Sequence, residues 1–180
     1  TLRDEDTQRE LLTDRVETMV AELAAALAPA RRMAPGPAAV LAEQHQHEMI
    51  EAARAHAERV QWEAFTRAVA TVPDGGTRQV LTWVRDLFGL TLIERHFAWY
   101  VVNGRLSAGR ARTVSSYRDR LLTRLRPHAQ ALVDAFGFSP AMLDAPIASG
   151  AERERQDEAR AYRRAARATG TSAVPEKHLR

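Results

Sequence analysis

The chain has 180 residues, of which 45% are hydrophobic and 27% charged, and its formal net charge is +3. This balance is typical of a folded globular protein of one domain or two small ones, and it excludes wholesale disorder. The absence of cysteine excludes disulfides, thiolate nucleophiles and cysteine-ligated zinc. No apolar run approaches the ~18 residues that cross a bilayer, so we expect no membrane partner.

Alanine and leucine are abundant, β-branched residues are scarce, and apolar residues recur with helical spacing along most of the chain. These features predict an all-α protein, a bundle of long antiparallel helices joined by short turns. The residues from Ala38 to Val72 include no proline or glycine and predict one continuous helix, which Pro73–Gly76 ends. The predicted helices span residues 7–27, 38–72, 77–103, 107–126 and 151–168.

Single residues mark the ends of these helices. Gly104 is a stop signal, Ser107 an N-cap, and Pro127 a point where the helix must kink or restart. Ser139 followed by Pro140 begins a short further turn of helix. We divide the chain into a helical bundle over residues 1–150 and a polar, Arg/Glu-rich helix with a loose tail over residues 151–180.

The first helix carries one apolar stripe, with charged residues on its other face. We expect this stripe to be an interface, either with further domains or with a second copy about a two-fold axis. The alternative is that it completes the core of its own chain. Its residues are Leu12, Val16, Met19 and Leu23.

Histidine and acidic residues gather in the predicted second helix, where His47 and Glu51 lie four residues apart and His45 is close by. A di-iron bundle needs a Glu-x-x-His pair on each of two helices, and no glutamate here has a histidine three residues later. We therefore expect solvated or interhelical polar residues and no metal; the role of the cluster stays open.

Other patterns have structural interpretations. Arginines alternate with acidic residues between 151 and 168, which is typical of a solvated helix and argues against a nucleic-acid partner. The aromatic residues between 83 and 100 favour a core or a domain interface. Glu94 beside them is expected to pair with a cation, with a catalytic base as the alternative. Since phosphate-binding loops and nucleophile motifs are absent, no catalytic residue is expected in this chain.

Several ordered blocks resemble the C-terminal part of the acyl-CoA oxidases. The resemblance extends over about residues 38–147 and is sharpest at Ala131–Phe138. The other blocks are Trp62–Phe65, Leu87–Glu94, Trp99, Asn103–Ser107 and Leu125–Ala129. The resemblance implies a FAD-dependent enzyme that oxidises an acyl-CoA to the trans-2-enoyl-CoA and reduces O2 to H2O2.

Only the second C-terminal helical domain of that family is matched, so no catalytic or flavin-binding residue carries over. His128, Asp134 and Phe136 match a family motif and are interpreted as packing residues, with Leu132, Val133 and Phe136 buried. The partners implied are the remaining oxidase domains or subunits, and acyl-CoA in the complete enzyme. The alternative is a stand-alone helical interaction module without catalysis.

The resemblance and the composition together predict a location. The chain ends in His178, Leu179 and Arg180 and lacks the Ser-Lys-Leu ending of peroxisomal members. Arginine enrichment is pronounced, since Lys177 is the only lysine. We therefore expect a bacterial, cytoplasmic protein.

Overall fold

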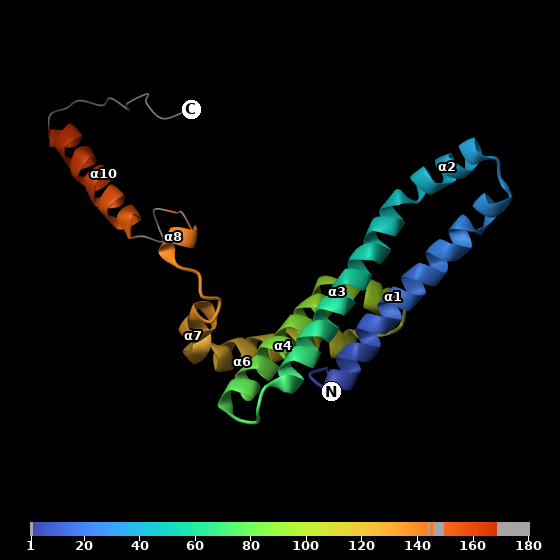
Figure 1. The fold of residues 1–180 in the computed structure, drawn as a ribbon, viewed down its shortest axis with the longest axis horizontal. Coiled ribbons are helices and arrows are strands. Elements are labelled where there is room, and N and C mark those ends of the chain that lie inside the picture. The colour runs from blue at the N-terminus through green and yellow to red at the C-terminus, as the bar shows by residue number, and fades with distance from the viewer. Residues whose placement is uncertain (1, 144, 146–149, 169–180) are drawn as a thin grey trace. The chain divides into compact units, whose positions relative to one another are not determined.

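The computed structural model describes residues 2–143, 145 and 150–168. All regular elements in these ranges are helical, and no strand occurs in them, which confirms the all-α prediction. In chain order they are α1 (Glu5–Leu27), η1 (Ala28–Arg32), α2 (Pro35–Gln44), α3 (Gln46–Thr71), α4 (Gly76–Arg95), α5 (Phe97–Val102), α6 (Ala108–Leu125), η2 (Arg126–His128), α7 (Ala129–Asp134), α8 (Pro140–Leu143) and α10 (Ala151–Ala168) (Figure 1).

The chain divides into two compact units, residues 1–129 and residues 130–180. In the first unit α1 and α3 run side by side, α4 packs against α3, and α6 packs against α4 (Figure 1). Because the connections are short, successive long helices are antiparallel neighbours, as the sequence predicted. The domain boundary that we placed at residue 150 stays a prediction.

The turn between α3 and α4 shows how short connections are held. Arg78, in the first turns of α4, donates from Nη2 to the carbonyl of Ala70 at 2.9 Å and from Nε to the carbonyl of Val72. It also pairs with Asp74. The last carbonyls of a helix have no partner within it, so this arginine satisfies the end of α3 and fixes the turn.

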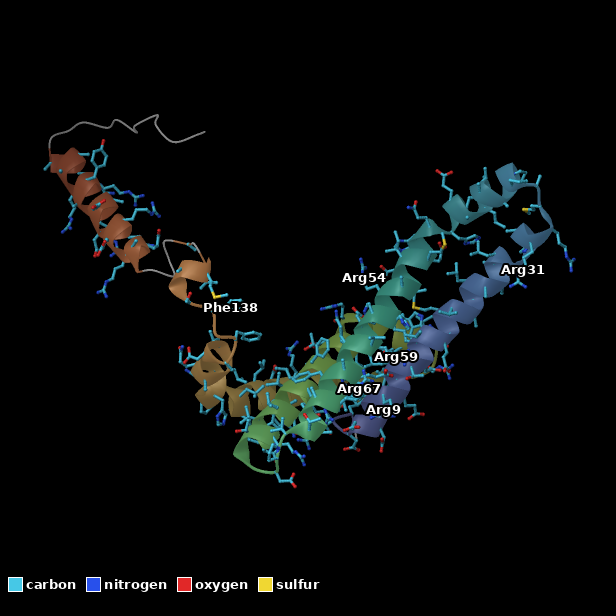
Figure 2. All side chains as sticks on the ribbon, viewed as in Figure 1. Arg9, Arg31, Arg54, Arg59, Arg67 and Phe138 are labelled. Carbon is cyan, nitrogen blue, oxygen red and sulfur yellow. The ribbon has the colours of Figure 1, made fainter. Side chains whose placement is uncertain are left out.

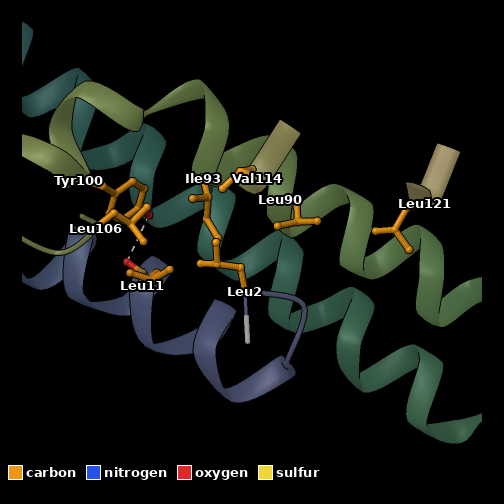
Figure 3. Packing of buried hydrophobic residues seen from close by; sticks show 8 residues of the cluster. All are labelled: Leu2, Leu11, Leu90, Ile93, Tyr100, Leu106, Val114 and Leu121. Atoms are coloured by element: carbon orange, nitrogen blue, oxygen red, sulfur yellow. Dashed lines mark hydrogen bonds between the residues drawn. The ribbon is translucent and has the colours of Figure 1, made fainter. Parts of the chain in front are cut away.

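The main apolar cluster of the first unit joins α1, α4, α5 and α6. Leu90, Ile93 and Tyr100 are completely buried against Leu11 of α1 and Val114 of α6 (Figure 3). The Tyr100 hydroxyl donates to the Leu11 carbonyl at 3.2 Å, which supplies the partner that a buried phenol requires.

The predicted helix ends are mostly confirmed. The Ser107 hydroxyl accepts from the amide of Arg110 at 3.2 Å and caps α6, and Gly104 has a positive φ of 68°. Pro127 lies in the 3-10 turn η2, so the chain restarts there. The Ser139 hydroxyl likewise accepts from the amide of Met142 at the start of α8. The predicted tail, residues 169–180, lies outside the described residues.

Two predictions of continuous helices are wrong. The helix expected over residues 38–72 is interrupted at His45 (φ −102°, ψ 16°), and the one expected over residues 77–103 at His96 (φ −112°, ψ 26°). Each interruption is one residue long. The amides of Met49 and Tyr100 still donate to the His45 and His96 carbonyls, at 3.0 and 3.2 Å. The apolar period therefore continues across both, which is why periodicity did not show them.

The predicted burial of Phe136 and Val133 is also wrong. Phe136 is 73% exposed and Val133 is 65% exposed, while Leu132 is half-buried. Among the described residues of the second unit, none is buried. The apolar stripe of this segment is present, but nothing in the described part of that unit covers it.

None of the helices in the described ranges is long and apolar enough to span a membrane.

Candidate functional site

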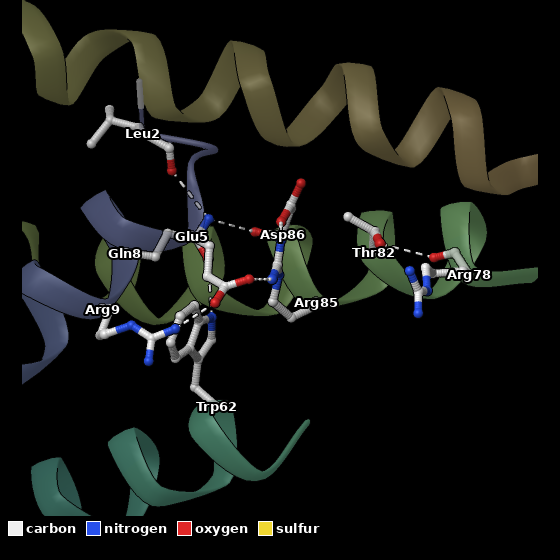
Figure 4. Close-up of polar contacts among 9 residues, drawn as sticks. All are labelled: Leu2, Glu5, Gln8, Arg9, Trp62, Arg78, Thr82, Arg85 and Asp86. Atoms are coloured by element: carbon white, nitrogen blue, oxygen red, sulfur yellow. Dashed lines mark hydrogen bonds and ion pairs between the residues drawn. The ribbon is translucent and has the colours of Figure 1, made fainter. Parts of the chain in front are cut away.

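A completely buried glutamine joins three helices of the first unit. Gln8 of α1 donates from Nε2 to the carbonyls of Leu2 and Asp86, at 3.1 and 3.2 Å, and its Oε1 accepts from Trp62 Nε1 at 3.0 Å (Figure 4). Trp62 is itself 0% exposed and packs against Leu12. Since all three polar groups of the side chains are satisfied, this network fixes the spacing of α1, α3 and α4.

Gly89 of α4 faces this network at very close range. A Cβ atom at that position would lie 1.9 Å from Gln8 Oε1 and 2.8 Å from Trp62 Nε1. Neither distance is compatible with van der Waals contact. Glycine is therefore required here because the amide and the indole pass directly over the helix backbone.

Arg85 closes the same network on its solvent side. Its guanidinium donates to Asp86 Oδ1 at 2.8 and 2.9 Å and to Glu5 Oε2 at 2.6 Å. Burial raises the pKa of Asp86, and the hydrogen bonds and charge of Arg85 oppose that rise. This guanidinium therefore pairs with both carboxylates and ties the start of α1 to α4.

A second buried polar cluster surrounds Glu58 of α3. Its carboxylate accepts from Arg15 at 3.1 Å and from Arg95 at 2.9 Å, and His96 Nε2 lies 3.1 Å from Oε2. Glu58 and Arg15 are 7% and 3% exposed. The interruption at His96 brings its ring to this carboxylate. Three basic groups around one carboxylate therefore connect α1, α3 and the end of α4.

The balance of charge in this cluster determines the protonation of His96. Burial lowers the pKa of His96 and the positive charge of Arg15 lowers it further, while Glu58 raises it and Arg95 lowers it slightly. At pH values between the lowered pKa and the ordinary histidine pKa near ~6.5, His96 is therefore protonated in the unfolded chain and neutral in the folded chain. Folding is favoured above that window and weakens as pH falls through it.

We expect the parent protein to lose thermal stability over the interval in which pH falls from about 7, through the ordinary histidine pKa of ~6.5, toward the lowered pKa of His96, because the unfolded chain takes up a proton there before the folded chain does. His96→Gln keeps a donor for Glu58 and does not titrate, so it should lose less over the same interval. Melting curves of both proteins across this interval measure the difference. Equal losses in the two would show that other groups carry the pH dependence. His47→Gln, an exposed position, is the matched control and should behave as the parent.

Glu94 has the structural role that we expected rather than that of a free base. It accepts from the Ser115 hydroxyl at 2.8 Å and pairs with Arg118, so α4 and α6 are tied together through it. A general base needs a free lone pair toward the substrate. The carboxylate of Glu94 is already committed to two donors from α6.

A groove lies between α1, the start of α3 and α5, and we name it the α1–α3 groove. Its volume is about 360 Å³, within the range of ~300–1,000 Å³ for ligand sites. Apolar side chains form its lining, and carboxylates and histidines stand among them. The lining residues are Met19, Glu22, Leu23, Ala26, His45, His47, Glu48, Glu51 and Trp99.

The groove contains the histidine cluster identified in the sequence, but its groups do not converge. His45 Nδ1 lies 3.8 Å from Glu48, and Glu51 is paired with Arg54. Across the described residues, no three histidine or acidic side chains lie close enough to hold a metal ion. What distinguishes the groove is an apolar lining beside two carboxylates, Glu22 and Glu48, that pair with no arginine in the described ranges.

The stripe of the first helix is divided between two environments. Leu12 and Val16 are 3% and 8% exposed and belong to the core of their own chain, as in the alternative we left open. Met19 and Leu23 are half-buried and line the α1–α3 groove. Only the second pair is therefore accessible to a partner.

The motif residues of the resemblance also differ in their surroundings. The His128 ring lies 6.2 Å from the ring of Trp83, within the first unit. Asp134 accepts from the side-chain amide of Gln130 at 2.8 Å instead of from an arginine. Phe136 is exposed and stacks on Phe138, with ring centroids 6.0 Å apart. Their interpretation as packing residues stays a prediction.

Exposed arginines on α1 and α3 project outward from the bundle (Figure 2). Arg9 pairs with Glu5, Arg54 with Glu51, and Arg67 with Glu63, each on its own helix. Such pairs neutralise the surface locally, whereas nucleic-acid binding uses arginines that are free for phosphates. The absence of a nucleic-acid partner remains a prediction, which these pairs favour.

These observations define a helical bundle domain. Its buried polar groups connect the helices, and its accessible features are a groove and exposed side chains. The family model described as acyl-CoA oxidase matches residues 5–150 of the chain. The chain belongs to the acyl-CoA oxidase family. Comparisons with curated proteins and with solved structures gave no match.

Proposed function

We propose that this chain is the C-terminal helical domain, or a separate helical subunit, of a FAD-dependent acyl-CoA oxidase. In the complete enzyme an acyl-CoA and O2 give the trans-2-enoyl-CoA and H2O2, and this chain has a structural and assembly role. The observation that carries the proposal is the family match over residues 5–150. The arginine-rich composition supports a bacterial, cytoplasmic enzyme by association.

The interior of the bundle supports an assembly role. Each buried carboxylate described here, Glu58 and Asp86, is bound by arginine, and Glu94 is bound by arginine and serine. Proton abstraction from an acyl-CoA requires a free base beside the substrate. The proposal therefore places that base, and the flavin that takes up the hydride, on other parts of the enzyme.

The family generally uses FAD, and the described residues do not fit it. A dinucleotide needs donors for its pyrophosphate, usually amides of a helix N-terminus or a glycine-rich loop. The α1–α3 groove presents Glu22 and Glu48, which repel phosphate. A second cavity of about 210 Å³ is below the ~300 Å³ of small ligand sites, and of the two arginines in its lining, Arg105 and Arg110, the first is paired with Asp14.

We expect the isolated chain, mixed with FAD and a long-chain acyl-CoA, to release no peroxide and to retain no flavin absorbance after gel filtration. An acyl-CoA oxidase truncated before its own second helical domain, supplied with this chain, should regain peroxide release. Peroxide from the chain alone would overturn the structural role. Failure to restore the truncated enzyme, when its own domain does restore it, would contradict the oxidase role.

The alternative function, a stand-alone interaction module without catalysis, has one observation in its favour. Large apolar side chains of the second unit are exposed, including Phe136 and Met142 at 73% and 68%. An interaction module needs such a surface, but so does a domain that docks within an enzyme. The complementation experiment distinguishes them, because only the domain restores oxidase activity.

A further inference from the structure

The second unit displays an aromatic segment, residues 130–143, that carries five exposed large apolar side chains. Phe136 and Phe138 are 73% and 60% exposed, and their rings stack at 6.0 Å with an interplanar angle of 9°. The others, each at least half exposed, are Val133, Met142 and Leu143. A patch of this kind is unusual on a monomer and marks a surface that another molecule covers.

The part of the second unit that the structure describes has no buried residue, so this segment has no core of its own. Burying a side chain such as phenylalanine or methionine contributes ~1.5–3 kcal/mol, and none of this is realised within the unit. Burial of these side chains therefore requires a surface outside the described part of the unit.

Helix α10 adds a requirement of charge. In its first half Arg155 pairs with Glu152 at 2.6 Å and Arg160 pairs with Asp157 at 3.3 Å. In its second half Arg163, Arg164 and Arg167 have no carboxylate partner in the described part of the chain. The complementary surface must then offer both an apolar hollow and free carboxylates.

The α1–α3 groove of the first unit has this combination. Its apolar lining includes Met19, Leu23 and the half-buried ring of Trp99. Glu22 pairs with no cation in the described ranges, and Glu48 has only His45 at 3.8 Å. An aromatic side chain can enter the hollow, while the rim attracts guanidinium groups.

We propose that the aromatic segment and the second half of α10 from one copy dock on the α1–α3 groove of a second copy. The exchange is reciprocal, so it closes into a two-fold dimer with two equivalent contacts. Phenylalanine side chains fill the hollow beside Trp99, and arginines of α10 pair with Glu22 and Glu48. This goes beyond the proposed function, because the exchange requires no other oxidase domain.

Sedimentation of the full chain tests the apolar half of the contact. The parent should be a dimer at micromolar concentration. Phe136→Ser with Phe138→Ser should give a monomer in which the helices of the first unit remain folded by circular dichroism, because neither ring belongs to the core of that unit. Leu122→Ser, which removes a 48% exposed apolar side chain on α6, is the matched control and should remain dimeric. A parent that is monomeric throughout this range would overturn the proposal.

A charge exchange tests the groove. One variant carries Glu22→Arg and Glu48→Arg, and the other carries Arg163→Glu and Arg167→Glu. Each alone brings like charges together in both contacts and should dimerise at least ~100-fold more weakly than the parent. An equimolar mixture opposes unlike charges in both contacts and should recover the dimer. Variants that stay dimeric alone, or a mixture that stays monomeric, would show that these surfaces do not meet.

Discussion

Gly89→Ala should destabilise the protein by about 3 kcal/mol, although alanine favours a helix by up to ~1 kcal/mol over glycine. The new methyl group would lie 1.9 Å from Gln8 Oε1 and 2.8 Å from Trp62 Nε1, so the amide must move. That movement breaks hydrogen bonds to Trp62 and to the carbonyls of Leu2 and Asp86. Overpacking costs ~1–3 kcal/mol, and orphaned buried polar groups cost a similar amount.

Denaturant unfolding followed by circular dichroism measures this change. The matched control is Gly109→Ala in α6, where the nearest atom to a new Cβ is Ser107 Oγ at 3.9 Å. There the helix preference of alanine acts alone, and the protein should be unchanged or more stable by up to ~1 kcal/mol. The same change, Gly→Ala, is then expected to lower the free energy of unfolding at position 89 and to leave it unchanged or raise it at position 109. A Gly89→Ala protein as stable as the control would show that Gln8 can leave its position at no cost.

The helices of the first unit could be predicted from the sequence because periodicity and breakers agree. Pro73–Gly76, Gly104 and Ser107 each end or begin a helix where expected. The interruptions at His45 and His96 could not, since a single residue outside the helical conformation leaves the apolar period intact. The partner of His96 at its interruption, Glu58, lies on another helix, which the local sequence does not reveal.

The buried polar networks are visible in the sequence as polar residues on an apolar helix face, and the apolar period alone does not explain them. Gln8 and Arg15 lie on the apolar side of the first helix, four residues before and three residues after Leu12. A polar residue on such a stripe must find a buried partner, but the sequence does not say which. Trp62 and Gly89 lie within the blocks that resemble acyl-CoA oxidases, and the structure gives both a physical reason in the Gln8 network.

The burial of the second unit could not be predicted for a different reason. The spacing of Leu132, Val133 and Phe136 indicates correctly that one face is apolar. A stripe of this kind requires a cover, yet it is equally consistent with a core of the same chain and with a partner surface. The structure favours the partner, because these side chains stay exposed within their own unit.

Glu58→Ala should be the most damaging substitution of a charged residue, with an expected loss of ~3–5 kcal/mol. It leaves the guanidinium of Arg15, 3% exposed, without its carboxylate in the interior of the bundle. It also removes the acceptor of Arg95 and His96 at the end of α4. Leaving one charge buried without a partner costs far more stability than the intact ion pair contributes.

The matched control lies five residues further along the same helix. Glu63→Ala removes a partly exposed carboxylate that pairs with Arg59 and with the exposed Arg67, so it should cost much less than Glu58→Ala, about 1 kcal/mol. Glu58→Leu combined with Arg15→Met removes both charges and should recover most of the stability lost by Glu58→Ala, since an apolar pair can replace a buried ion pair. Chemical denaturation of the four proteins measures these differences. Equal losses for Glu58→Ala and Glu63→Ala would mean that water reaches Arg15, and the cluster would then be a surface ion pair with no role in joining α1 to α3.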